Sequence, residues 1–227
     1  MSEATDGAAA PFVPRARLTV LIDFKSTHAY LAKDATLALE AATGIDTQWL
    51  PLTVTHPLSA DHPLNAAHAR REPVAASDRG ARHSRIRARY YEQDLRRYVA
   101  WRGLPVTDVY PDCDSTLSGL GLLWLADAQT VVRSRYVNLM FDSYFGKALD
   151  LDRVRGAVDE AGGDGAAFAT FAQGEGPIRF AQLQASLRAA GYGTSPTYVL
   201  DGEQFQGRQH LPLLRRLVQV GRTDALR

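Results

Sequence analysis

The chain has 227 residues, 45% of them hydrophobic, which suits one soluble domain or a small domain that carries an inserted one. Its 26 basic and 25 acidic residues leave a formal charge of +1. The net charge therefore gives no reason to expect binding to a nucleic acid or to an anionic membrane. The single cysteine, Cys113, excludes an internal disulfide and a CxxC redox pair.

The N-terminal segment 1–16 is predicted to be disordered. It begins with acidic residues, and prolines interrupt its only apolar stretch, so it is a poor signal peptide. The chain has no uninterrupted run of about 18 apolar residues, and no membrane-spanning helix is expected. The sequence therefore predicts a cytoplasmic protein with a loose beginning.

The first regular elements alternate strand, helix and strand. Residues 18–24 are rich in Val, Ile and Leu, which is typical of a buried strand. A helical pattern follows over 28–42 and stops at Gly44, and residues 45–52 alternate like a second strand. Two strands joined by a helix pack most simply as parallel neighbours with a right-handed crossover.

The helix at 28–42 is predicted to be amphipathic. Leu31 and three alanines recur at helical spacing on one side of it. Lys33, Asp34 and Glu40 group on the other side, which is the pattern of a helix with a polar outer face.

Residues 53–78 have an irregular pattern, and a long helix is predicted to begin at Arg79. Gly103 and the proline after it end this helix, which holds eight arginines between Arg79 and Arg102. The arginines are spread around the helix, so a solvated face is favoured over an RNA-binding stripe.

Neither the histidines nor the cysteine predict a reactive centre by their spacing. His56, His62 and His68 recur every six residues, whereas zinc sites use closer pairs or a helical i, i+4 spacing, so no metal site is expected. Cys113 lies between two aspartates, which raise a thiol pKa, and it is expected to be a poor nucleophile.

The middle of the chain is predicted to be entirely helical. Apolar residues recur at helical spacing in five further segments. These are 117–128, 131–145, 151–161, 166–171 and 177–190. We therefore expect a helical insertion domain over 66–190.

The C-terminal part returns to strands. Two β-rich runs flank Asp201-Gly202, a strong signal for a two-residue hairpin, and residues 208–220 form an amphipathic helix. The predicted fold is α/β and thioredoxin-like, ordered β-α-β … β-β-α, with the helical insertion in its middle. The thioredoxin-like domain is predicted to consist of residues 17–65 and 191–227.

Ser26-Thr27-His28-Ala29 stands where the first strand turns into a helix. Backbone N–H groups and the helix dipole attract anions and thiolates to this end. Ser26 is either a helix cap or a ligand-facing hydroxyl, and these roles are compatible. His28 is a candidate general acid or base, or else a packing residue, and Lys25 either binds a substrate carboxylate or is solvated.

Ser195-Pro196 is the second unusual pair. A proline that opens a core strand cannot donate to the ladder. It is either an ordinary trans proline at a strand start, which the local sequence favours, or a cis proline that turns the preceding backbone toward a ligand.

Together these segments resemble the thioredoxin-superfamily branch of 2-hydroxychromene-2-carboxylate isomerases, kappa-class glutathione transferases and related dithiol oxidases. Three stretches carry the resemblance, and the order of elements agrees with it. They are "DFKSTHAYLA" (23–32), "CDSTLSGLGLLWLA" (113–126) and "GTSPTYVLDGEQFQGRQHL" (193–211).

The resemblance implies a thiol site without a redox-active dithiol. The oxidases have cysteines at the positions of Ser26 and Ala29, so their chemistry is expected to be absent here. The isomerases and transferases have a serine at the place that Ser26 takes in this chain. The resemblance implies that this serine hydrogen-bonds the sulfur of glutathione. The other residues implied to bind glutathione or another low-molecular-weight thiol are Ser195, the cis-proline Pro196, Gly207, Arg208, Gln209 and His210.

The chain departs from the family pattern at several positions. The tetrad has Thr27 where a proline is usual, and the insertion has Asp114 where asparagine is frequent. Arg208-Gln209 replaces a pair that ends in aspartate. The carboxylate that would pair with the γ-glutamyl ammonium is therefore missing there, or replaced by the amide of Gln209.

By resemblance, the predicted function is thiol-dependent isomerisation of a small aromatic or conjugated substrate, with Ser26, His28 and Lys25 as catalytic residues. The alternatives are transferase-like conjugation, a thiol-independent reaction, and non-catalytic binding. A homodimer is expected, without nucleic-acid or membrane partners. The substrate is expected to contact Tyr110, Asp114, Ser115 and Trp124.

Overall fold

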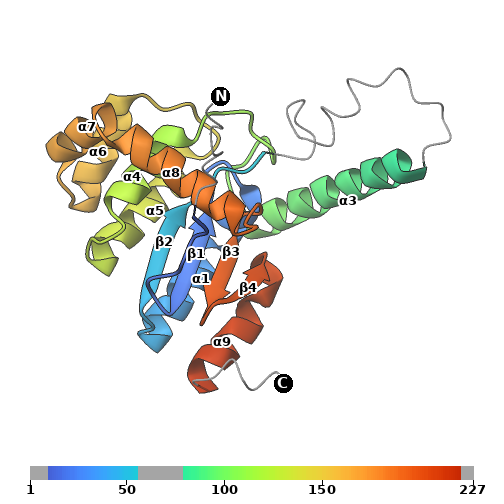
Figure 1. Cartoon of the computed structure of the whole chain (residues 1–227). Helices are drawn as coiled ribbons and strands as arrows, with labels where there is room; N and C mark the ends of the chain where they lie inside the picture. Colours follow the sequence, from blue (N-terminus) through green and yellow to red (C-terminus); the bar gives the residue numbers. More distant parts are fainter. Residues whose placement is uncertain (1–9, 56–78, 221–227) are drawn as a thin grey trace, which may run out of the picture.

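A computed structural model describes residues 10–55 and 79–220, apart from the side chains of 79–85 and 88. Four strands form one mixed sheet in the order β2-β1-β3-β4. The central strand β1 (Leu18–Ile22) pairs in parallel with β2 (Thr47–Pro51) and antiparallel with β3 (Thr197–Leu200). The edge strand β4 (Glu203–Gln206) pairs antiparallel with β3 (Figure 1).

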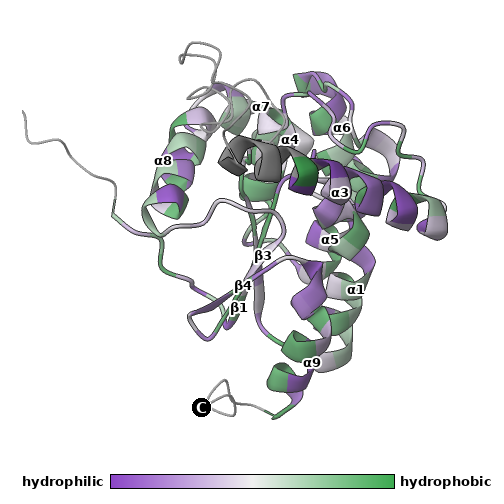
Figure 2. Ribbon diagram, turned by 90° about the vertical axis from the view of Figure 1, so that its right-hand side faces the viewer, coloured by the Kyte–Doolittle hydropathy of each residue, from purple (hydrophilic) through white to green (hydrophobic). Residues whose placement is uncertain are grey.

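The sheet is buried on both faces, because alternate residues of each strand point to opposite sides. Val20, Trp49 and Tyr198 join the core cluster that contains residues of α1 (Thr27–Thr43) and α9 (Leu211–Val220). Leu21, Leu50 and Val199 join a second cluster with Leu187 of α8 (Gly176–Ala189). Figure 2 accordingly shows α8 on one side of the strands and α1 with α9 on the other.

The predicted hairpin turn is confirmed. Asp201 has a φ of 50° and Gly202 a φ of 86°, the two positive values that a tight turn between β3 and β4 requires. A short 3₁₀ turn, η1 (Arg208–His210), then leads into α9. The α/β thioredoxin-like class and the order β-α-β … β-β-α are as predicted.

Six helices lie between β2 and β3 within the described chain. The long helix α3 stands away from the body, and the others pack together beside the sheet (Figure 1). They are α3 (Arg79–Arg102), α4 (Thr116–Trp124), α5 (Thr130–Tyr144), α6 (Leu151–Ala161), α7 (Gly165–Gln173) and α8. The predicted boundary at 65/66 lies outside the described residues, so the division into domains stays a prediction.

The prediction that Lys33, Asp34 and Glu40 form a solvent-exposed face of α1 is wrong for Lys33 and Glu40. Lys33 is 4% exposed and Glu40 is 6% exposed, because helix α5 covers them. The Lys33 ammonium contacts the Asp142 carboxylate at 2.8 Å, and Glu40 is paired with Arg133. The sequence pattern could not reveal this, because both partners lie about a hundred residues further along the chain.

No helix among the described residues is long and apolar enough to cross a membrane.

Candidate functional site

The N-terminus of α1 meets the start of β3 through Ser26 and Ser195. The Ser26 hydroxyl accepts a hydrogen bond from the Ala29 amide at 3.3 Å, so Ser26 is the helix cap. The same hydroxyl donates to the Ser195 carbonyl oxygen at 3.0 Å. The peptide bond from Ser195 to Pro196 is cis, as the resemblance implied and the local sequence did not favour. Two of the predicted segments therefore come together in the fold.

The loop that carries Pro196 is held from both sides. The Asp23 amide donates to Ser195 Oγ at 2.7 Å, which fixes the loop to the end of β1. The Gly207 amide donates to the Pro196 carbonyl at 2.9 Å, and Gly207 has a φ of 88° that favours glycine. Gly207 is thus next to the thiol site that the sequence predicts.

His28 lies close enough to Arg208 and to Asp94 of α3 for their charges to act on its imidazole. Burial and the charge of Arg208 lower the pKa of its imidazole, and the charge of Asp94 acts in the opposite direction. His28 is therefore neutral at pH 7, so one of its ring nitrogens can donate a hydrogen bond and the other can accept one.

Arg208 forms a cluster with two residues of α3. Its guanidinium carbon lies 3.7 Å from the centre of the Tyr98 ring, and its Nη2 lies 3.9 Å from an oxygen of Asp94. The ring stacks on the guanidinium of Arg208. The other oxygen of Asp94 lies 3.7 Å from Arg97, so Asp94 has two long contacts to guanidinium groups and a close hydrogen bond to neither. The sequence did not identify Asp94 as a site residue, because its helix is far from Arg208 in the chain.

Gln209 and His210 contact residues of β4 and do not join the cluster of Arg208 with α3. Gln209 Nε2 donates to the Gln206 carbonyl at 2.7 Å, and its side chain is exposed beside Gly207. The ring of His210 packs edge-on against Phe205, with centres 5.8 Å apart.

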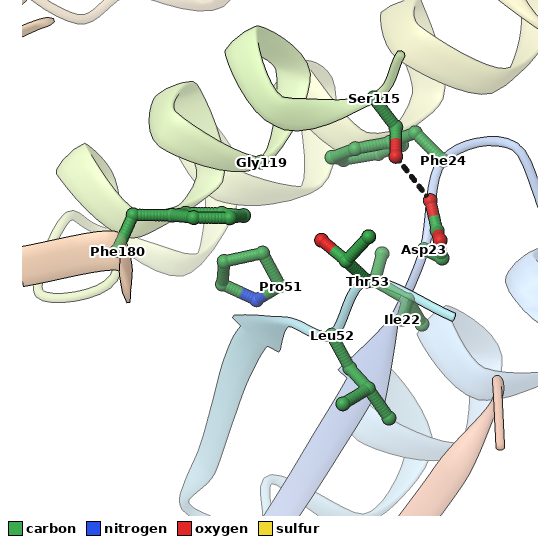
Figure 3. Close-up of a pocket in the computed structure, with 9 residues that line it drawn as sticks. All are labelled: Ile22, Asp23, Phe24, Pro51, Leu52, Thr53, Ser115, Gly119 and Phe180. Carbon is green, nitrogen blue, oxygen red and sulfur yellow. Dashed lines mark hydrogen bonds between the residues drawn. The ribbon is translucent and has the colours of Figure 1, made fainter. Parts of the chain in front are cut away.

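Asp23 is a buried carboxyl group that the sequence interpretation also missed. It is 3% exposed and accepts a hydrogen bond from Ser115 Oγ at 2.6 Å (Figure 3). It also accepts from the Val54 amide at 2.8 Å and the Lys25 amide at 3.2 Å. Burial raises the pKa of Asp23, and these hydrogen bonds act against that rise. Asp23 thus joins the end of β1, the segment after β2 and the start of α4.

Two small hollows flank this carboxyl group. The first, which we call the Phe180 hollow, is a shallow depression too narrow to admit a water molecule. Its wall includes Asp23 and Ser115 on one side and Pro51, Gly119 and Phe180 on the other (Figure 3). A Cβ atom at Gly119 would lie 2.7 Å from the Phe180 ring, so only glycine allows this approach.

The second, which we call the lysine hollow, is a shallow depression with room for about one water molecule. Lys25, Cys113, Asp114, Tyr144 and Lys147 line it together with Ser115. Burial raises the pKa of the Cys113 thiol, Lys25 lowers it, and the neighbouring aspartates raise it. The predicted direction is therefore right, although burial contributes more than the aspartates.

The carboxyl group of Asp114 is ionised at the edge of the lysine hollow. One of its oxygens accepts hydrogen bonds from the Thr116 hydroxyl at 2.6 Å and the Thr116 amide at 2.9 Å. These bonds and the charge of Lys25 lower its pKa, while burial opposes them. Asp114 therefore brings a negative charge to the hollow at neutral pH.

The other two predicted substrate contacts line neither hollow. Burial and the charge of Glu92 raise the pKa of Tyr110 to about 12, and its backbone amide donates to Asp108 at 2.9 Å. Trp124 ends α4, about 13 Å along the helix from Ser115, and packs on Phe171.

The three histidines considered as metal ligands, His56, His62 and His68, lie outside the described residues. Within 10–55 and 79–220, no three or more His, Cys, Asp or Glu side chains are grouped to hold a metal ion.

Comparisons with solved structures place this fold next to two kinds of enzyme. A 2-hydroxychromene-2-carboxylate isomerase matches with a TM-score of 0.61 and 18% identity over 92% of this chain and 97% of its own. A probable DsbA oxidoreductase from Streptomyces coelicolor matches with a TM-score of 0.56 and 17% identity over 92% of both chains. At this identity the likeness shows the thioredoxin-like fold with its helical insertion. No family model and no curated protein sequence matches the chain.

Proposed function

We propose that the protein is an isomerase that borrows a low-molecular-weight thiol such as glutathione and acts on a small conjugated or aromatic substrate. The observation that carries the proposal is the contact between Ser26 at the N-terminus of α1 and the cis Ser195-Pro196 bond. A serine replaces the cysteine that a dithiol oxidase would need there, so the site suits a bound thiolate and not a dithiol cycle.

Ser26 and Ser195 would exchange partners when the thiol binds. The carbonyl of Ser195 would accept from the cysteinyl amide of the thiol, which releases the Ser26 hydroxyl to donate to the sulfur. The N-terminus of α1 favours the thiolate form of that sulfur. Thr27 does not compete for it, because its hydroxyl is buried and donates to the Val109 carbonyl at 2.7 Å.

Arg208 and Asp94 would bind the far end of the thiol. The α-amino-acid end of a γ-glutamyl group carries one carboxylate and one ammonium. The guanidinium of Arg208 suits the carboxylate, and the Asp94 carboxylate suits the ammonium. Asp94 thus supplies from α3 the charge that is absent at position 209.

The reaction would proceed by addition, rotation and elimination. The thiolate forms a bond to an unsaturated carbon of the substrate, and the displaced electron pair moves to the carbonyl oxygen. The former double bond rotates as a single bond, after which the electron pair returns and the thiolate leaves unchanged. Lys25 faces the lysine hollow and would steady the enolate charge, while His28 lies on the side of Arg208.

The first experiment is a calorimetric titration of the protein with glutathione and with S-methylglutathione, which cannot form a thiolate. We expect micromolar binding of glutathione, at least about tenfold tighter than that of the S-methyl form, and loss of this preference in Ser26→Ala. Asp150→Ala is the matched control, because Asp150 caps α6 in the same manner, with an Arg153 amide bond of 2.8 Å, away from this site.

Turnover then separates the alternatives. An isomerase regenerates the thiol, so free thiol stays constant during substrate conversion, whereas a transferase consumes it. Equal binding of both glutathione forms, or none at millimolar concentration, would contradict the thiol site and favour a thiol-independent reaction or a binding protein. The proposed assembly is a homodimer, and light scattering of the purified protein tests it.

A further inference from the structure

Asp23 contacts both halves of the Ser26–Ser195 site through its main chain. Its amide donates to Ser195 Oγ at 2.7 Å, and its carbonyl oxygen accepts from the Ser26 amide at 3.0 Å. The position of this one residue therefore sets how the cap of α1 lies relative to the loop that holds the cis peptide bond. An interaction that holds Asp23 in place also holds the shape of the site.

The carboxyl group of Asp23 is held by donors from three segments. One oxygen accepts from the Lys25 amide at 3.2 Å and from the Ser115 hydroxyl at 2.6 Å, and the other accepts from the Val54 amide at 2.8 Å. Of these three donors, only Ser115 donates from a side chain, and it lies at the start of α4 (Figure 3). A substitution at position 115 can therefore remove this one link and leave the two main-chain donors in place.

Ser115 gives up a local role to make this contact. It occupies the N-cap position of α4, where a serine oxygen usually accepts from an amide of the first turn, but its side chain makes no such bond. Ser115 is 7% exposed, and its hydroxyl donates to Asp23 instead. Since this partner lies 92 positions away in the chain, the contact indicates a role for Ser115 beyond its own helix.

We propose that Ser115 is a positioning residue for the Ser26–Ser195 site and acts on it through the carboxyl group of Asp23. Ser115 holds the carboxyl group, and the main chain of Asp23 in turn holds the Ser26 amide and Ser195 Oγ. The start of α4 thereby maintains the arrangement of the site through Asp23. The effect on thiol binding rests on the proposed function, whereas the link between Ser115 and the site does not.

Three amide groups report on this link, and Ser115 is not the acceptor for any of them. The amides of Asp23, Lys25 and Ser26 donate to Ser195 Oγ, to the Asp23 carboxyl group and to the Asp23 carbonyl, respectively. Their hydrogen exchange, resolved by NMR, measures how often these bonds open. A role of Ser115 that is confined to α4 would leave all three exchange rates unchanged.

Ser115→Ala should speed exchange at these three amides about tenfold, because the Asp23 carboxyl group loses one of its donors. Ser115→Thr keeps the hydroxyl and should keep the native rates. Thr47→Val is the matched control, because the Thr47 hydroxyl donates to the Ile45 carbonyl at 2.9 Å and Thr47 is also 7% exposed. Thr47 pairs with Leu18 at the other end of β1, about 16 Å along the strand from Asp23, so its loss should leave the three rates unchanged.

Calorimetry with glutathione then tests whether this arrangement matters for binding. We expect Ser115→Ala to bind glutathione about fivefold more weakly than the native protein, and Thr47→Val to bind it equally well. Native exchange rates in Ser115→Ala would overturn the proposal, as would an equal acceleration in Thr47→Val or full glutathione affinity in Ser115→Ala. Faster exchange in Ser115→Ala, together with a native protein that binds no glutathione, would leave the link standing and remove the thiol-dependent function.

Discussion

The Ser26 hydroxyl donates to the carbonyl of Ser195 at 3.0 Å across 169 positions of the chain. This bond joins the cap of α1 to the cis-proline loop. It also leaves the hydroxyl committed to protein partners until a ligand takes the place of one of them.

Loss of the Ser26 hydroxyl should reduce stability as well as thiol binding. Ser26→Ala removes the cap of α1, and we expect the free energy of unfolding to fall by about 1 kcal/mol in urea titrations. Asp150→Ala should cost a similar amount through its own helix and leave glutathione affinity intact. A stable Ser26→Ala protein with full affinity would remove Ser26 from the site.

The pair Arg208 and Asp94 should determine which thiols bind. Asp94→Asn removes the charge opposite the γ-glutamyl ammonium, and we expect glutathione affinity to fall about tenfold. Cysteinylglycine lacks the γ-glutamyl group, so its affinity should not change. Calorimetry with both thiols measures the difference, and a parallel loss for both would show that Asp94 acts only on the structure.

Arg208→Lys is a further test of the same pair. Lysine keeps the charge but loses the planar stacking on Tyr98, where the guanidinium lies 3.7 Å from the ring centre. We expect this variant to bind glutathione more weakly than the native protein and more tightly than Arg208→Gln. Equal affinity of all three proteins in the same titration would exclude a role for Arg208 in binding.

Asp23 should make stability depend on pH. Burial raises its pKa above the ordinary 3.8, so the folded protein holds this proton more tightly than the unfolded chain does. Its contribution to stability is complete below pH 3.8 and is lost as the pH rises through the folded-state pKa. The advantage of the native protein over Asp23→Asn, measured by urea unfolding, should therefore shrink from pH 3.5 to pH 7. An advantage that grows over this range would show that the ionised carboxylate is the favoured acceptor.

The buried pair of Glu40 and Arg133 should be costly to break from one side. Glu40 also accepts from Trp49 Nε1 at 3.1 Å, so its loss leaves a guanidinium and an indole N–H without this partner. We expect Glu40→Met to lower the free energy of unfolding by about 3–5 kcal/mol. The double variant Glu40→Met with Arg133→Met should recover part of that loss, because it leaves no unpaired charge. The exposed pair Glu92 and Arg96 is the control, and its loss should cost about 0.5 kcal/mol.

The sequence by itself determined the order of elements and several turns. Periodicity predicted the helices of the insertion to within a few residues, because burial of one face repeats at the spacing of the helix. Asp201-Gly202 predicted its hairpin because few residues accept positive φ. Ser26 was correctly identified as a cap candidate, since capping is a local interaction with the third residue after it.

Only the tertiary structure decided which distant side chains meet. The burial of Lys33 and Glu40 follows from helix α5, and no pattern within α1 reveals that partner. Asp23 joins three segments because Ser115 and the segment after β2 converge on it, and Asp94 lies beside Arg208 because α3 passes there. Local preference acts over a few residues, whereas the pairing of charges across a hundred residues depends on how the finished elements pack.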